Sequence, residues 1–563
     1  MKKSNLLMVA VGSAVIMTSC GKKVNPFMAD YFTTNPNPLE VVGERVPATV
    51  NGNIPAKFFV KNAVVTVTPT LVYDGTESKS QSYTFQGEKV LGNNPVISYD
   101  NGGTVTIPVA FNYVPAMDQS TLYLDFSVAQ GNKQYALPRV AVANGVISTA
   151  AMANASTVTP SLAKDAFQKD INEAYAADIM FLINVANIRA NQLSTDAMEE
   201  LRNEIKKAYS DDKRVLEEIN IKSYASPDGP MSFNTQLAEK REANTKGYIN
   251  DQLKKDNITE FNNLTAEFTP EDWAGFKELV SKSNIQDKQL ILSILERFND
   301  PEVRDQKIKE LGQVFNELAE QILPQLRYSR ITASVKVIGK TDSELLAALN
   351  STPDQLTVEE ILYAATLTND PKVKQSTYAT AAKYFPNDYR VWNDLGLAQY
   401  VNGDLAAAAT SFNKAKSLNA NAAEPVANLG LIALANSNYS EATKLLGAAS
   451  NADNIGEMLG TLYLKQGDAQ SAVRAFGNTK SNNAALAQLL TRDYTKAKNT
   501  LTSVANPDAD TYYMLAVIGA RTNNQNMVKE NLTKAIKLNP AKAAKAAKDL
   551  EFAQFSIAEL TNN

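Results

Sequence analysis

The sequence predicts a multidomain protein with an all-β sandwich near its N-terminus, an α+β domain in the middle and an α-solenoid of helical repeats in its C-terminal part. Three patterns predict this organisation. Apolar and polar residues alternate over 46–148, strand-like and helix-like patterns alternate over 166–342, and a helical pattern recurs every 34 residues within 345–545. At 563 residues, the chain has room for about four folding units.

Composition and charge exclude several classes of function. Hydrophobic residues make up 44% and charged residues 21% of the chain, which is typical of proteins that fold in water. The net charge of −4 provides no broad basic surface, so we expect no nucleic-acid partner. With no histidine and one cysteine, the chain cannot use Ser-His-Asp or Cys-His catalysis, imidazole or thiolate metal sites, or an intramolecular disulfide.

The first twenty residues have the pattern of a cleaved signal. Two lysines precede an apolar run over 6–17, which is too short for a permanent membrane span. The only cysteine, Cys20, follows two small residues. This segment resembles a bacterial lipoprotein signal, and the resemblance implies a signal peptide over 1–19 and acyl chains such as palmitate on Cys20. An ordinary secretory signal with a chance cysteine is the alternative.

The residues after Cys20 bear on location. Bacterial lipoproteins that stay in the inner membrane usually have aspartate directly after the lipidated cysteine. This chain has Gly21 at that position, so its resemblance to lipoproteins implies the outer membrane. Residues 21–23 are Gly-Lys-Lys, whereas the surface-export tag of Bacteroidota lipoproteins resembles an acidic cluster at this place. We therefore expect a domain that faces the periplasm. Residues 20–45 contain three prolines and little periodicity, which predicts a lipid-anchored tether.

The region 46–148 reads as short strands. The runs 64–68, 104–107 and 122–126 alternate apolar and polar residues, and glycine-rich or asparagine-rich turn signals separate them. We expect a β-sandwich. A membrane barrel is the alternative, which Pro69 and Pro108 disfavour because they interrupt candidate strands. Residues 149–165, rich in Ala, Ser and Thr, predict a linker.

The middle region 166–342 alternates strands with helices. The predicted elements are a strand over 179–185, a helix over 195–209, a strand over 219–224, a helix over 232–253 and a final strand over 331–338. A helical insertion is expected at about 256–325. Within it, the sequence Thr269-Pro270-Glu271-Asp272 predicts a helix start, with the Thr269 hydroxyl as the cap.

Residues 221–249 carry a specific resemblance. Asn234, Leu237 and Arg241 match the motif of the OmpA-like, peptidoglycan-binding domain. The strand over 331–338, which follows Arg327 and Arg330, resembles the closing strand of that fold. The resemblance implies that a carboxylate binds the ammonium of a cell-wall amino acid, while an arginine fork holds its carboxylate.

One position departs from that motif. The aspartate of the family falls on Ser226, and Asp228 lies two residues later. The candidate peptidoglycan-binding residues are therefore Asp228, Asn234 and Arg241. The alternative is that Asp228-Gly229 is only a turn and Arg241 only a solvated helix charge.

The C-terminal part resembles tetratricopeptide (TPR) repeats, which present a concave surface to peptides or partner domains. Glycine and alanine stand where the two helices of a repeat must approach closely, and phenylalanine and leucine fill the space between repeats. The signature residues are Trp392, Leu395, Gly396, Ala408, Phe412, Leu429, Gly430, Ala442, Gly460, Ala472, Phe476 and Pro540. We expect five or six repeats over 345–545 and a helix or tail over 546–563. The alternative is that the repeats act only as a spacer or pack on the OmpA-like domain.

Together these features resemble Bacteroidota outer-membrane lipoproteins with OmpA-like and TPR regions. We expect a non-enzymatic protein, without cofactor or metal, that contacts the membrane through its lipid, peptidoglycan through 166–342 and partner proteins through the repeats. One alternative is an accessory subunit of an outer-membrane assembly or secretion complex without peptidoglycan binding. Another is an enzyme, such as a glycosidase with paired carboxylates, although no spacing singles out such a pair.

Overall fold

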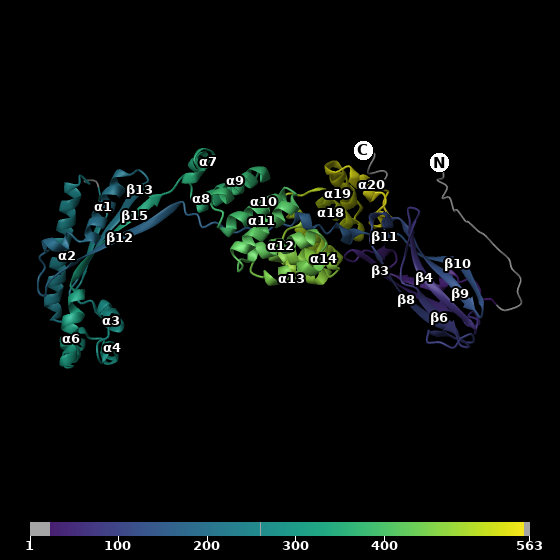
Figure 1. The fold of residues 1–563 in the computed structure, drawn as a ribbon, viewed down its shortest axis with the longest axis horizontal. Coiled ribbons are helices and arrows are strands. Elements are labelled where there is room, and N and C mark those ends of the chain that lie inside the picture. Colours follow the sequence, from purple (N-terminus) through teal and green to yellow (C-terminus); the bar gives the residue numbers. More distant parts are fainter. Residues whose placement is uncertain (1–22, 259–260, 557–563) are drawn as a thin grey trace. The chain divides into compact units, whose positions relative to one another are not determined.

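The computed structural model describes residues 23–258 and 261–556, which fall into two compact units (Figure 1). Among the described residues, one unit joins 23–164 with 368–556, and the other lies within 165–367. The expected signal peptide and Cys20 lie outside the described residues. No helix within 23–258 or 261–556 is long and apolar enough to cross a membrane.

The N-terminal region of the first unit is rich in β structure and contains several sheets. One sheet has the order β1 (Phe32–Asn35), β3 (Arg45–Ile54), β8 (Gly103–Asn112). A second has the order β10 (Lys133–Asn144), β9 (Ser120–Gln130), β4 (Ala63–Tyr73), β6 (Tyr83–Gly87), β7 (Val96–Ile97), with β5 (Thr76–Lys79) paired to β4. β2 (Leu39–Glu40) pairs in parallel with β11 (Val146–Ile147).

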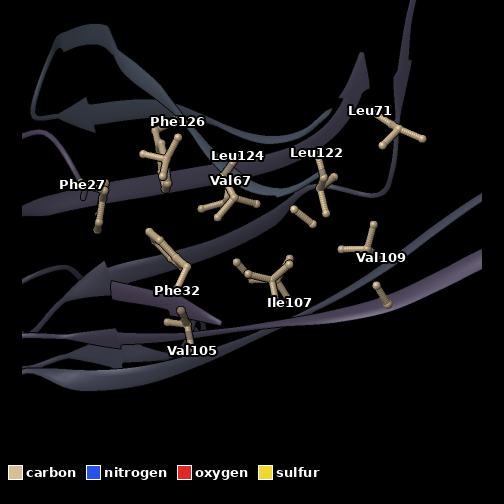
Figure 2. Packing of buried hydrophobic residues seen from close by; sticks show 14 of the residues in the cluster. Phe27, Phe32, Val67, Leu71, Val105, Ile107, Val109, Leu122, Leu124 and Phe126 are labelled. Atoms are coloured by element: carbon tan, nitrogen blue, oxygen red, sulfur yellow. The ribbon is translucent and has the colours of Figure 1, made fainter. Parts of the chain in front are cut away.

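One hydrophobic core joins the two larger sheets. Every second residue of β8 and β9 is buried, as the sequence alternation predicts. Figure 2 shows Ile107 of β8 and Leu122 and Phe126 of β9 pointing into the same layer of side chains. Burial on one face of each sheet therefore holds this region together.

The stretch 20–45 is not a free tether over its described residues. Val24 and Phe27 are buried in the core, and the Phe27 ring stacks on Phe126 with 4.4 Å between centroids. Both β1 and β2 also lie within this stretch. The apolar residues of this stretch complete the core through contacts with distant strands. The three prolines and the weak periodicity predicted a tether because such contacts leave no local pattern.

The second unit is built on a four-stranded mixed sheet. Its order is β12 (Asp170–Met180), β15 (Tyr328–Ile338), β13 (Arg214–Tyr224), β14 (Leu264–Thr269), with β13 antiparallel to β15 and parallel to β14. Its helices are α1 (Asp196–Ser210), α2 (Met231–Lys255), α3 (Trp273–Lys282), α4 (Lys288–Arg297), α5 (Pro301–Lys309), α6 (Gln313–Gln321), α7 (Asp342–Ser351) and α8 (Val358–Thr366).

Three sequence predictions for this unit need correction. The first strand is β12 rather than 179–185; it lies at the sheet edge with much of its length exposed, so it lacks a strong apolar signal. The insertion over 256–325 is not wholly helical, because it contains β14. The cap of α3 is Asp272, whose carboxylate accepts from the Gly275 amide at 2.8 Å, while Thr269 ends β14.

The C-terminal region consists of helices that pack against one another in successive pairs (Figure 1). They are α9 (Pro371–Tyr384), α10 (Tyr389–Val401), α11 (Leu405–Leu418), α12 (Ala423–Ala435), α13 (Tyr439–Ala448), α14 (Ile455–Gln466), α15 (Ala469–Phe476), α16 (Asn482–Leu490), α17 (Tyr494–Thr502), α18 (Ala509–Arg521), α19 (Gln525–Leu538) and α20 (Ala541–Ala546). In 547–556 only a short 3-10 turn follows, η8 (Leu550–Phe552).

The signature glycines lie where paired helices touch. A Cβ atom on Gly396 would lie 2.7 Å from the Phe412 ring, and one on Gly460 would lie 2.7 Å from the Phe476 ring. Gly430 approaches the Leu446 side chain equally closely. The recurring glycine and large apolar residue therefore set the distance between the two helices of a repeat.

The other signature residues have unequal roles. The alanines of the second helices, Ala408, Ala442 and Ala472, are fully buried, and Leu395 is also buried. Leu429 and Trp392 are only partly buried, and the Trp392 indole donates to the Pro386 carbonyl at 2.8 Å. Pro540 directly precedes α20.

Candidate functional site

The predicted Arg241 is a buried residue of α2. It is 1% exposed, and its Nε, Nη1 and Nη2 donate to the carbonyls of Val185, Tyr224 and Leu182 at 3.1, 2.8 and 3.1 Å. The interpretation of Arg241 as a solvated helix charge is therefore wrong. Burial, together with neighbouring Arg327, lowers the pKa of Arg241 to about 10, so that it remains a cation at neutral pH.

Asp228 has a cationic partner that the sequence analysis did not assign to the site. Arg327, just before β15, lies 3.3 Å from the Asp228 carboxylate and donates to the Ser226 hydroxyl at 3.1 Å. The Ser226 hydroxyl in turn donates to Asp228. Ser226 thus links Arg327 to Asp228. The placement of Arg327 beside the last strand was the signal that could have identified it.

Asn234 holds the loop between β13 and α2. Its Nδ2 donates to the Gly229 carbonyl at 3.2 Å and to the Glu271 carboxylate at 3.3 Å. Because the side chain is buried and both contacts are internal, Asn234 fixes the backbone next to Asp228.

These predicted residues line one pocket of about 220 Å³, which we call the Arg241 pocket. Its charged lining consists of Arg241, Arg327 and Asp228. Two guanidinium groups and one carboxylate leave the pocket with a net positive charge. That combination can hold the carboxylate of a small ligand, and Asp228 can accept an ammonium group on the same ligand.

A second candidate site lies on the repeats and was missed in the sequence analysis. The first helices of successive pairs carry buried polar side chains: Asn393 and Asp394 with Tyr400 on α10, Asn428 on α12, Thr461 on α14 and Asn483 on α16. We call this set the first-helix face. A polar residue at these positions would be costly to bury without hydrogen bonds.

The partner of the first-helix face is the main chain of residues 149–164. Asn428 accepts from the Ser161 amide at 2.6 Å and donates to the Ser161 carbonyl at 2.8 Å. Asn483 makes the same pair of bonds with the Asn154 amide and carbonyl, at 3.0 and 2.7 Å. Asn393 adds a second donor to the Ser161 carbonyl at 3.0 Å.

Two further side chains bind the same segment. The Asp394 carboxylate accepts from the Ala163 amide at 2.9 Å, and the Tyr400 hydroxyl donates to the Ala155 carbonyl at 2.9 Å. Burial raises the pKa of Asp394 to about 8, against opposing hydrogen bonds from Ala163 and Asn393. Asp394 is thus the one member of this face whose charge depends on pH near neutrality.

The prediction of a linker over 149–165 therefore needs correction. Most of this stretch packs against the repeats, and Ala153, Ala155 and Val158 belong to the cores of the helix pairs. The composition suggested a flexible connection because small residues are common in linkers. Small residues are also the ones that fit between closely spaced helices, and only the contacts with distant residues distinguish the two cases.

Among residues 23–258 and 261–556, no group of three or more Cys, Asp or Glu side chains is placed to hold a metal ion. The sequence expectation of no metal remains an expectation for the chain as a whole.

Comparison with known proteins supports the repeats. A family model described as tetratricopeptide repeat matches residues 509–542. The chain is similar to a tetratricopeptide repeat protein from Parabacteroides merdae, with 14% identity over 39% of this chain and 89% of that one and a TM-score of 0.28. No curated protein matches.

The chain is also similar to two other solved structures. Pseudomonas aeruginosa pilF has 17% identity over 39% of this chain and 100% of that one, with a TM-score of 0.29. The APC/C hetero-tetramer Cut9-Hcn1 has 14% identity over 58% of this chain and 62% of that one, with a TM-score of 0.32. With the family match at 509–542, the spacing of the signature residues and the paired helices, the chain is a tetratricopeptide-repeat protein in its C-terminal half.

Proposed function

We propose that the protein is a non-enzymatic lipoprotein of the outer membrane that contacts peptidoglycan through residues 166–342 and binds partner proteins through its repeats. The observation that carries the wall-binding part is the Arg241 pocket, which gathers Asp228, Asn234 and Arg241 with Arg327. TPR repeats imply protein partners, which supports the second part. The lipid anchor rests on the sequence around Cys20, and we propose a position facing the periplasm.

The pocket suits an amino acid of the cell-wall peptide. The mixed sheet places the loop after β13 next to the start of α2, so that Asp228 and Arg241 come from neighbouring elements, as in the OmpA-like resemblance. A ligand carboxylate would bind between Arg241 and Arg327, and its ammonium would bind Asp228. Since these charges are largely buried, their attraction is screened less than at an open surface.

Co-sedimentation of the full chain with purified peptidoglycan tests this proposal. We expect wild type to sediment with the wall and Asp228→Asn to lose most of that binding, because the ammonium loses its counter-charge. Arg330→Gln is the matched control, since Arg330 is an exposed arginine of β15 that pairs with Asp178. Failure of the folded wild type to sediment would overturn the wall-binding part.

The accessory-subunit function remains the second candidate, and two observations favour it. Ser226 stands at the aspartate position of the motif, and each of the three guanidinium nitrogens of Arg241 already donates to a main-chain carbonyl. In that case the protein would co-purify with stoichiometric partners after the peptidoglycan has been digested. Loss of every partner upon digestion would instead support contact through the wall.

A further inference from the structure

Residues 149–164 are recognised through their main chain. The bonded groups are the amides of Asn154, Ser161 and Ala163 and the carbonyls of Asn154, Ala155 and Ser161. Each of these groups pairs with a side chain of the first-helix face. Such bonds resemble those that hold an extended peptide on a receptor, where main-chain contacts supply affinity and side chains supply selectivity.

The buried side chains that face the repeats are small or of medium size, and Met152 also packs against the repeat core while partly buried. Ala153, Ala155, Val158, Ser161 and Ala163 are at most 7% exposed. The residues between them, such as Ser156, Thr157 and Thr159, are exposed. The segment contains two short 3-10 turns, Thr149–Met152 and Ala155–Thr157. The first-helix face therefore accepts an irregular chain segment with small residues at its buried positions, because a larger side chain would need space that the packed helices fill.

The asparagine side chains of this face are buried and hydrogen-bonded. Asn393, Asn428 and Asn483 are at most 2% exposed. Two of them also bond within the face, because Asn428 donates to Asn393 and Asn483 donates to Thr461. Without the segment, the amide oxygens of Asn428 and Asn483 would lose the main-chain donors that they accept from. Because buried polar groups in folded proteins are almost always hydrogen-bonded, this face needs the segment or another chain in its place.

Both ends of the segment are also held. Near its start, the Thr149 hydroxyl donates to Glu551, which also pairs with Arg521 of α18. At its end, Lys164 pairs with Asp453 at 2.8 Å. Because the segment is part of the same chain, its concentration at the face is effectively about millimolar or higher. A peptide from another protein would have to compete against that concentration.

We propose that the first-helix face is a peptide-binding site whose ligand is the chain's own segment 149–164. The segment occupies the face in the folded protein and keeps peptides of other proteins from binding there. Partner proteins then bind the repeats through other surfaces. This inference concerns the repeats alone, so it stands or fails independently of peptidoglycan binding.

A labelled synthetic peptide of residues 149–164 tests the proposal. It is titrated into the full chain and into a full-length variant in which residues 150–163 are replaced by a Gly-Ser stretch of equal length. We expect the variant to bind the peptide and wild type not to bind it at concentrations that saturate the variant. Adding Asn428→Ala and Asn483→Ala to the variant should weaken binding at least tenfold. Asn413→Ala, an exposed asparagine of α11, should leave it unchanged.

Two results would overturn the proposal. One is equal binding by wild type and variant, which would mean that the face is open in solution. The other is absence of binding by a variant that circular dichroism shows to be folded. Should the variant not fold, hydrogen exchange on wild type decides the question. The amides of Asn154, Ser161 and Ala163 should then be protected, and exchange at the rate of the free peptide would refute the proposal.

Discussion

Asn428 and Ser161, separated by 267 residues in sequence, form a closed pair of hydrogen bonds in which the asparagine side chain pairs with both main-chain groups of the serine. Asp394, 34 residues before Asn428, occupies the same position of the preceding repeat and binds the Ala163 amide. In these two repeats, the 34-residue period thus places equivalent side chains against the segment 149–164.

Removing the Asn428 side chain from this pair of hydrogen bonds should destabilise the first unit. Asn428→Ala leaves the buried Ser161 amide without an acceptor, so we expect the free energy of unfolding to fall by about 2 kcal/mol. Urea unfolding followed by circular dichroism measures this change. Asn413→Ala, whose side chain is exposed, serves as the control and should change stability by less than about 0.5 kcal/mol. Equal effects of the two substitutions would contradict the importance of the pair.

The titration of Asp394 should make stability depend on pH. Its pKa is raised from 3.8 to about 8 in the folded chain, so the folded state holds a proton between these values that the unfolded state releases. The stability contributed by this group therefore falls as pH rises through that window and is lowest above about pH 8. Asp394→Asn cannot titrate and keeps an oxygen that can accept from Ala163.

Thermal unfolding of wild type and Asp394→Asn at a series of pH values between 5 and 9 measures this effect. We expect the variant to gain stability relative to wild type as pH increases. A difference between the two proteins that stays constant across the series would show that Asp394 does not titrate in this window.

The contact of Gly460 with Phe476 should tolerate no added methyl group. Gly460→Ala places a Cβ atom 2.7 Å from the ring, and we expect a loss of about 1–3 kcal/mol from the overpacked pair. Gly447 in α13 has no atom within 4 Å of an added Cβ, so Gly447→Ala should stabilise by about 0.5–1 kcal/mol through helix propensity. Opposite signs of the two changes in melting temperature are the expected result.

Arg241 should act on stability as well as on binding. Arg241→Ala removes donors from three carbonyls, and we expect a loss of about 3 kcal/mol. Asp228→Asn should cost less, because its amide oxygen can still accept from Ser226 and Arg327. Urea unfolding together with peptidoglycan co-sedimentation separates the two roles. Full wall binding by Asp228→Asn would remove Asp228 from the proposed site.

The features that the sequence predicted well are local. The helices over 195–209 and 232–253 lie within one or two residues of α1 and α2, because their patterns repeat within each helix. The signature glycines of the repeats are also placed correctly, since each one meets a residue sixteen positions later in its own pair. Spacing within a short window was sufficient for these elements.

The features that were missed depend on distant residues. β14 is six residues long, and its partner β13 lies earlier in the chain beyond α2. Arg327 meets Asp228 from 99 residues away. The first-helix face binds residues 149–164, whose composition alone resembles a flexible connection. An asparagine or aspartate at the same position of consecutive repeats, Asp394 and Asn428, was the available signal for this face.

The position of the segment in the chain sets an order for biosynthesis. Asn154 and Ser161 leave the ribosome long before Asn483 and Asn428, which lie 329 and 267 residues later. Until those residues are made, the segment lacks its native partners, and contacts of such long range form late in folding. A truncated chain that ends before α12 would lack the partners of Asn154 and of the Ser161 amide, so residues 149–164 reach their final state only when the repeats are present.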